Sequence, residues 1–423
     1  MTVFFQYDTL TWPEVAALPR DIPLILPLGE GYGFDSLSSA LGEPLRAGLL
    51  PPFPFGWQGS GLVVPEAILG ATLANLLDSL RDDGFSRVYA LTPQGIDLGL
   101  GASRIALPRG TGNVTVLSSV GAGECGGGQQ PPDHASESAP TQHTQIFGFY
   151  EEIGGKEPHT IPYDSERGKV VLLPIGHTEQ HGYHLPLSVD TLIIEAIGQG
   201  TASAASEQAC CLPVMPYGVS THRKAFAGTL NSGGRAFEDF WVAVIDVLAG
   251  RGFDRFYFLS GHGGNMSFLV NVVKYTGERH RRIFCATSFL YLSGPEGVAA
   301  LQAHRRSPHG GMGHACELET ALILHLRPDL VQMDKAVDEM DFIATPSYSM
   351  DWIESGALIA NPPWDDDTLT GAYGAGSLAT AEHGQIWLKA AIAEKITHVA
   401  EIHEQHQKRE ARRRAGFGLW GKV

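Results

Sequence analysis

Short apolar segments alternate with longer amphipathic segments throughout residues 146–405, and this alternation limits the possible fold more than any other feature of the chain. The first expected strand covers residues 170–175, a later one covers residues 283–292, and the last expected helix covers residues 385–406. Such alternation is typical of an α/β fold with a central, mostly parallel sheet flanked by helices. Ligands of these sheets bind beyond the carboxyl ends of the strands. Polar residues that directly follow an expected strand are therefore the first candidates for a functional site.

Composition narrows the class of protein. The chain has 423 residues, 43% of them hydrophobic, which is enough for one large or two medium domains. The formal net charge of −16 argues against a nucleic-acid partner, because nucleic-acid-binding proteins usually present a basic face. No apolar run has the length of a membrane-spanning helix, and no signal-peptide pattern is evident. We therefore expect a cytoplasmic protein without a membrane partner, whose five cysteines stay reduced.

The sequence divides into four parts. Residues 1–117 have the pattern of a folded domain, and residues 146–405 form the second and larger folded unit. Between them, residues 118–145 are rich in Gly, Pro and Ser and nearly lack large apolar side chains. Such a segment cannot bury enough surface to offset its ordering entropy, so we expect a linker or mobile loop. Residues 406–423 are basic, and we expect a solvated tail.

Three segments of the first folded unit resemble segments of the second, in the same order. Residues 26–29 resemble 173–176, residues 50–56 resemble 212–218, and residues 84–91 resemble 252–259. Matches in series predict a duplicated fold, present as two tandem copies.

The two expected copies differ in their polar residues. Without gaps, Glu179 and His181 align with Tyr32 and Phe34, and the histidine of the second unit's Gly-His-Gly-Gly segment aligns with Gln94. The first copy thus keeps the scaffold and lacks the polar groups. We expect it to be a degenerate, non-catalytic domain that packs against the second copy or shapes its pocket.

Carboxylates and imidazoles gather in three segments of the second unit. Residues 171–191 and 259–265 each begin as an apolar strand, and residues 314–320 open an apolar helix. The candidate residues are Glu179, His181, Asp190, His262, His314, Glu317 and Glu319. Together, such side chains suit zinc, manganese, iron or cobalt better than calcium or magnesium. The three segments therefore predict one metal site.

The candidate ligands are too many for one tetrahedral zinc, whereas two metals that share a carboxylate would use them all. Asp190 is the natural bridge, because it lies between the pair Glu179 and His181 and the distant His262. Two metals about 3.5–4 Å apart would hold a bridging hydroxide and polarise a carbonyl group. This is hydrolase chemistry without an organic cofactor. His314 is the best candidate to protonate the leaving group.

Each of these features also has an ordinary interpretation. In a chain with 17 histidines, any single one is more often structural than functional. Glu317 and Glu319 could simply favour the positive end of a helix dipole. The Gly-rich residues 261–265 could be a strand-to-helix turn, and they lack the lysine and the glycine spacing of phosphate-binding loops. A metal-free scaffold or binding protein is therefore the alternative from another class.

Four motifs resemble those of the creatininase (creatinine amidohydrolase) family. EQHGYHLP at 179–186 with Asp190 resembles EQHGPHLP…TD, FAGTL at 226–230 resembles FPGTL, SGHGGN at 260–265 resembles NGHGGN, and HACELET at 314–320 resembles HAGExETS. The resemblance covers roughly residues 146–405, with a weaker echo in residues 1–117. It implies a layered α/β fold and two divalent metal ions per chain, of zinc, manganese or iron.

The resemblance also implies residue roles. Glu179, His181, Asp190 and His262 would be metal ligands, with Asp190 as the bridge. In creatininase proper the fifth ligand is a glutamate two residues after the histidine, and Gly264 stands at that position here.

Relatives with the Gly-Gly form use a glutamate of the last motif instead, so Glu319 is the preferred fifth ligand. Glu317 stays open as that ligand, since it would share a helix face with His314 if that histidine lay on the helix. We otherwise expect His314 and Glu317 to be the catalytic side chains.

The function that the resemblance implies is an amidohydrolase that cleaves a non-peptide C–N bond in a small cyclic amide or formamide. Creatinine itself is not expected, because Gly263 and Gly264 replace the bulkier pair of creatininases. The alternatives are hydrolysis of a C–C or lactone-type bond in a cyclic keto-sugar and the trimming of a small peptide. We expect a small-molecule substrate and a homo-oligomer, in which the first domain could replace a neighbouring subunit.

Overall fold

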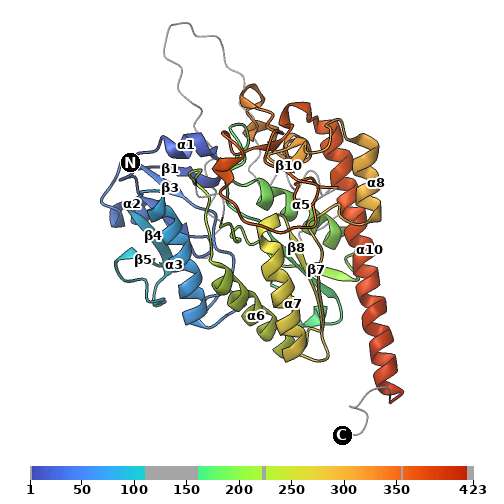
Figure 1. The fold of residues 1–423 in the computed structure, drawn as a ribbon. Coiled ribbons are helices and arrows are strands. Elements are labelled where there is room, and N and C mark those ends of the chain that lie inside the picture. The colour runs from blue at the N-terminus through green and yellow to red at the C-terminus, as the bar shows by residue number, and fades with distance from the viewer. Residues whose placement is uncertain (1, 110–160, 222–224, 354–355, 417–423) are drawn as a thin grey trace, which may run out of the picture.

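The computed structural model describes residues 2–109, 161–221, 225–353 and 356–416 (Figure 1). The linker expected at residues 118–145 lies outside the described residues.

Two parallel sheets form the centre of the fold (Figure 1), and the expected α/β architecture with flanking helices is confirmed. The first sheet has the strand order β1-β3-β2-β4-β5 and the second has the order β7-β6-β8-β9. The strands are β1 (Val3–Gln6), β2 (Leu24–Pro27), β3 (Arg46–Leu49), β4 (Val88–Pro93), β5 (Arg104–Leu107), β6 (Val170–Ile175), β7 (Ala209–Cys211), β8 (Arg255–Ser260) and β9 (Phe284–Thr287). A short antiparallel pair, β10 (Met312–His314) and β11 (Tyr373–Gly374), lies apart from both sheets.

The α-helices that cover the sheets are α1 (Trp12–Ala16), α2 (Phe34–Ala40), α3 (Glu66–Asp82), α5 (Val189–Ala204), α6 (Gly234–Gly250), α7 (Met266–Arg279), α8 (Pro295–His304), α9 (Glu317–Leu326) and α10 (Ala381–Arg414). β6 is buried along its whole length, as expected for a central parallel strand covered on both faces. Among the described residues, no helix is long and apolar enough to cross a membrane.

The two sheets share their strand order and part of their register. The order β3-β2-β4-β5 of the first sheet corresponds to β7-β6-β8-β9 of the second. Pro27 of β2 lies opposite Leu91 of β4, and Pro174 of β6 lies opposite Leu259 of β8. These are the pairs that the sequence alignment of the two units equates.

One hydrophobic core joins the two units. Helices α3 and α6 pack side by side, and leucines at helical spacing on α3 face the aromatic side of α6. The rings of Phe53 and Phe240 meet edge to face at 5.5 Å. The hydroxyl of Tyr217 donates to the carbonyl of Pro51 across the same boundary. The first unit is therefore an integral part of the fold.

Helix α10 closes the other side of the molecule, where it packs against α5, α8 and α9 (Figure 1). Its buried Glu394 accepts hydrogen bonds from the amides of Gly294 and Gly297 at 2.8 and 3.2 Å, where a carboxylate favours the N-terminal end of α8. The helix was expected to end at His406 but continues to Arg414, so the expected basic tail begins as helix.

The strand expected over residues 283–292 is too long. β9 ends at Thr287, and Leu290 and Leu292 have φ angles of +47° and +56°, which no strand accommodates.

The helix expected to begin at His314 begins later. His314 ends β10, Ala315 takes a φ angle of +49°, and α9 starts only at Glu317. His314 and Glu317 therefore do not share a helix face.

Candidate metal centre

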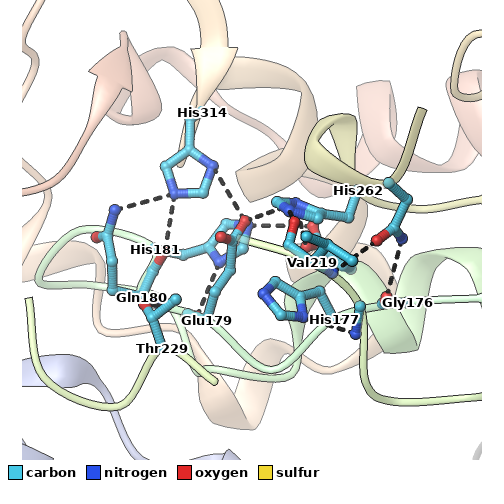
Figure 2. Close-up of polar contacts among 12 residues, drawn as sticks. Gly176, His177, Glu179, Gln180, His181, Val219, Thr229, His262 and His314 are labelled. Atoms are coloured by element: carbon cyan, nitrogen blue, oxygen red, sulfur yellow. Dashed lines mark hydrogen bonds and ion pairs between the residues drawn. The ribbon is translucent and has the colours of Figure 1, made fainter. Parts of the chain in front are cut away.

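Six of the predicted site residues meet at the carboxyl ends of β6 and β8 (Figure 2). Glu179 and His181 follow β6, His262 follows β8, and Asp190 and Glu319 lie in the first turns of α5 and α9. The sixth, His314, ends β10. All six are at most 3% exposed. The crevice that parallel sheets use for ligands is therefore lined here by acidic and imidazole groups.

Asp190 divides its two carboxylate oxygens between two groups of residues. Its Oδ2 lies 3.3 Å from Nδ1 of His262, and that nitrogen lies 2.9 Å from Oε1 of Glu179. Its Oδ1 lies 3.2 Å from Nε2 of His181, which lies 3.9 Å from Oε1 of Glu319. Each group offers two carboxylates and one imidazole, and Asp190 belongs to both.

Backbone carbonyls orient the two histidines. Nδ1 of His181 lies 3.1 Å from the carbonyl oxygen of Glu179, and Nε2 of His262 lies 3.0 Å from that of Val219. Because a carbonyl only accepts, these nitrogens carry the hydrogens. The remaining nitrogen of each ring faces the carboxylates, as in metal sites where a histidine donates its other N–H to a carbonyl.

The charges of the cluster alter its proton affinities. Burial alone lowers the pKa of His181, but Asp190 and Glu319 outweigh it and raise the pKa to about 9. Burial likewise opposes Glu179 and Asp190 at His262, whose pKa is also raised to about 9. Burial raises the pKa of Asp190, yet the two histidines lower it overall. Positive charge therefore stabilises the buried carboxylates, and divalent cations can supply it in place of protons.

Glycine is required at position 264. A Cβ atom there would lie 2.3 Å from the carbonyl oxygen of Val219 and 2.4 Å from Nε2 of His262. The space that a longer side chain would need is taken by the hydrogen bond that orients His262. In this geometry the carboxylate beside His181 comes from Glu319.

The structure places Glu317 outside the cluster. Its Oε1 accepts a hydrogen bond from the amide of Arg306 at 3.0 Å, and its Oε2 accepts one from the amide of Ser307 at 2.7 Å. Residues two apart on a helix do not face the same way, so Glu317 points away while Glu319 points in. This carboxylate holds the backbone before β10, and its expected role in catalysis stays a prediction.

His314 lies at the edge of the cluster with a defined orientation. Its Nε2 donates to the carbonyl of Gln180 at 2.7 Å, and its Nδ1 lies 3.8 Å from Oε1 of Glu179. The ring lies 4.1 Å from that of His181 and meets the ring of Trp364 edge to face at 5.6 Å. Nδ1 is therefore the nitrogen that can exchange a proton within the site.

His177 also belongs to the cluster, although sequence reasoning did not select it as a site residue. Its Nδ1 accepts a hydrogen bond from the amide of Gly218 at 2.9 Å, and its ring stacks on that of His262 at 4.4 Å. Its position two residues before Glu179 was the available signal, because alternate side chains of an extended segment share a face.

Buried carboxylates and imidazoles at the carboxyl ends of a parallel sheet form a cluster that could hold divalent metal ions. The creatininase family model, described as creatinine amidohydrolase, matches residues 159–399. The chain belongs to this family. The match begins after the first sheet, which it does not include.

Individual relatives differ in function. Mycofactocin precursor peptide peptidases of Mycobacterium ulcerans and Mycolicibacterium smegmatis are 31% and 33% identical over 176 residues, covering 39% and 40% of this chain. Creatinine amidohydrolase of Pseudomonas putida is 29% identical over 185 residues, covering 40% of this chain and 68% of that protein. The chain spans only 61% and 62% of the length of the two peptidases.

Solved structures of the family are also similar. A structure described as creatininase with Mn is 23% identical, with a TM-score of 0.48, and the match covers 60% of this chain and 95% of that one.

Proposed function

We propose that the chain is an amidohydrolase that holds two divalent metal ions and cleaves a non-peptide C–N bond in a small cyclic amide or formamide. The observation that carries the proposal is the division of the Asp190 oxygens between two triads, at 3.2 Å from His181 and 3.3 Å from His262. Two metals held by these residues would supply an activated water molecule and a polarised carbonyl group. Zinc, manganese and iron all suit these donors.

Each metal has its own set of donors in this proposal. Glu179 and His262 would hold one ion, His181 and Glu319 would hold the other, and Asp190 would belong to both sets. The hydrogen bonds from His181 and His262 to backbone carbonyls fix the rings that donate to the metals.

His314 is the acid/base of the proposed reaction. The bond from its Nε2 to the carbonyl of Gln180 leaves Nδ1 to carry the transferred proton. Nδ1 lies 3.8 Å from a Glu179 oxygen, so one water molecule between them would carry the proton that Nδ1 then passes to the leaving nitrogen.

Trimming of a small peptide is the second candidate. Identities of 31% and 33% to mycofactocin precursor peptide peptidases favour it. Turnover of a panel of formamides, cyclic amides, cyclic ketones and short peptides separates the candidates, because each class carries a different scissile bond.

Metal content tests the site itself. Elemental analysis of protein purified without added metal should give up to two Zn, Mn or Fe per chain, and His262→Ala should lose metal and activity together. His280→Ala is the matched control, because His280 also contacts a carboxylate, Asp246 at 2.6 Å, but lies outside the cluster. Full metal retention in His262→Ala would refute the assignment.

We further propose that residues 1–117 are a degenerate copy of the second unit. The chain makes the same backbone hydrogen bond just after each central strand. The amide of Gly29 donates to the carbonyl of Phe53, and the amide of Gly176 donates to the carbonyl of Met215, each at 2.9 Å. Where the second unit has Glu179, the first has Tyr32, whose hydroxyl donates to a backbone carbonyl within its own unit.

The first unit also shapes the site in this proposal. The amides of Leu187 and Ser188, directly before Asp190, donate to carbonyls of the first unit at 2.9 and 3.1 Å. The indole of Trp12 donates to the carbonyl of Thr370 at 2.8 Å, and its ring lies 5.4 Å from that of Tyr183.

Trp12→Ala should therefore raise KM far more than Trp57→Ala, a substitution in the core of the same unit. Equal effects on KM would contradict a role of Trp12 at the site. If the first unit replaces a neighbouring subunit, light scattering should find a homo-oligomer smaller than a hexamer, and a plain hexamer would contradict that.

A further inference from the structure

Exposed apolar side chains gather on one irregular segment, residues 337–369. Of the thirteen large hydrophobic side chains that are exposed among the described residues, six lie in this segment. Ile343, Ile359 and Leu369 are the most exposed of these six, at 69%, 91% and 82%. The segment also contains eight aspartates and glutamates and no lysine or arginine. Exposed apolar side chains that gather in this way mark a surface for another molecule.

Hydrogen bonds bring apolar and acidic residues of segment 337–369 together. The amide of Ile343 donates to Oδ1 of Asp367 at 2.9 Å, and the amide of Leu369 donates to Oε1 of Glu339 at 2.9 Å. Three carboxylates close to them in sequence are exposed, and their side chains make no hydrogen bond or ion pair within the described residues: Asp341, Asp365 and Asp366. Negative charge thus surrounds the exposed Ile343 and Leu369.

A basic surface lies at the far end of α10. The last seven residues of this helix include five basic side chains: Lys408, Arg409, Arg412, Arg413 and Arg414. Nη2 of Arg413 donates to the carbonyl of Arg281 at 3.1 Å, so the exposed Arg281 and Arg282 extend the same surface. Positive charge is therefore concentrated here, in a chain whose formal net charge is −16.

The two surfaces of one chain cannot meet. α10 begins next to segment 337–369, because the amide of Ser377 donates to Oδ1 of Asp338 at 3.0 Å just before the helix starts at Ala381. At about 1.5 Å per residue, the helix places Arg414 roughly 50 Å away, at the opposite end of the molecule (Figure 1). The acidic surface of one copy is therefore open to the basic surface of another.

The chemistry of the two surfaces is complementary. Segment 337–369 offers exposed carboxylates around apolar side chains. The end of α10 offers guanidinium groups, since Arg412 and Arg414 are exposed and make no hydrogen bond or ion pair in the described part of the chain. The sequence shortly after α10 adds Phe417, Leu419 and Trp420, so this end of the chain is apolar as well as basic in composition. Complementary charges on two surfaces steer their association and fix its register.

We propose that segment 337–369 of one copy binds the basic end of α10, residues 408–414, of a second copy. Each copy then offers one surface of each kind, so the contact closes into a symmetric pair or a ring. The same segment carries Trp364, whose ring lies 5.6 Å from that of His314, so the second copy would bind next to the metal centre. The contact itself requires neither metal nor substrate.

Charge reversal on either surface tests the contact. One variant carries Asp365→Lys with Asp366→Lys, and the other carries Arg412→Glu with Arg414→Glu. Light scattering over a dilution series at low salt should show the parent protein associating. Each variant alone should need a concentration about tenfold higher or more to associate, because like charges then face each other.

Mixing the two variants separates pairing of the surfaces from misfolding. An equal mixture should associate as the parent protein does, because each new lysine then meets a new glutamate, whereas a misfolded surface would not recover. Raising the salt from about 0.05 M to about 0.5 M NaCl should weaken the association of the parent and of the mixture alike, since salt screens these charges. Asp21→Lys with Asp239→Lys, at exposed positions outside both surfaces, is the matched control and should associate as the parent does.

Each other outcome overturns the proposal. A parent protein that stays monomeric at low salt shows that the two surfaces do not bind each other. Association that neither variant weakens places the contact elsewhere. Association that both variants lose and that mixing does not restore shows that the two surfaces are not partners. None of these results bears on the metal centre, because the metal content of the protein is measured separately.

Discussion

Metal binding should release protons from the two histidines of the cluster. The pKa values of His181 and His262 are raised to about 9, so both rings are protonated at pH 7 when no metal is bound. A metal needs the neutral ring, so two bound metals should displace about two protons per chain. Below pH 9 the affinity of each metal should therefore rise about tenfold per pH unit. From pH 7 to 9 this amounts to roughly 2.7 kcal/mol per site.

Calorimetric titration with Zn²⁺ in buffers of different ionisation enthalpy measures the number of released protons directly. His280→Ala should release the same number of protons as the parent protein, because that histidine lies outside the cluster.

The thermal stability of the metal-free protein gives a second readout with a defined sign. The two histidines have higher pKa values in the folded protein than in the unfolded chain, where the value is about 6.5. Their protonation therefore stabilises the folded state fully below about pH 6.5, and this stabilisation is lost as the pH rises through about 9. The metal-free protein should therefore melt at lower temperature across this range. Affinity that does not change between pH 7 and 8.5, with no proton release, would refute the reasoning.

Four substitutions test individual roles. In elemental analysis, Glu319→Gln should reduce bound metal from two ions to one per chain, whereas Glu317→Gln should keep two. Glu317→Gln should instead lower the free energy of unfolding by about 1–3 kcal/mol, as thermal melting would show. The reverse pattern would restore Glu317 as a ligand. His314→Asn should keep both metals and lower kcat by about 10²–10⁴-fold, and unchanged turnover would exclude it as the acid/base. Gly264→Ala should weaken the metal of the Glu179 triad, because its Cβ would displace the ring of His262; unchanged affinity in metal titration would contradict the required glycine.

Much of the site followed from local sequence. Glu179 and His181 lie two apart after an apolar run, and His262 follows a second such run, so the carboxyl-end rule for parallel strands brings them together. The alternation of strands and helices likewise predicted the parallel sheet of the second unit. Both inferences depend on periods of two or 3.6 residues, which a sequence displays directly.

The motif resemblance favoured Glu319 over Glu317, but the direction of each side chain could not follow from spacing along the sequence. It depends on where α9 begins, and the helix begins late because Ala315 adopts a φ angle of +49°. Ala315 carries no sequence signal for that conformation, since glycine and asparagine are the residues that usually adopt it. The turn at Leu290 was missed for the same reason, so the expected strand ran past Thr287.

The glycine at position 264 and the carboxylate of Glu319 are two parts of one arrangement of the site. With glycine at 264, Nε2 of His262 reaches the carbonyl of Val219 and Nδ1 turns toward Glu179 and the bridging aspartate. The motif resemblance led us to expect a glutamate at this position in creatininases, and this chain has none there. Oε1 of Glu319 lies 3.9 Å from Nε2 of His181, so Glu179, Asp190 and Glu319 are the three carboxylates of the described cluster. We therefore propose that the two positions are coupled: a longer side chain at 264 has no room while His262 keeps its hydrogen bond, and α9 supplies the second carboxylate beside His181.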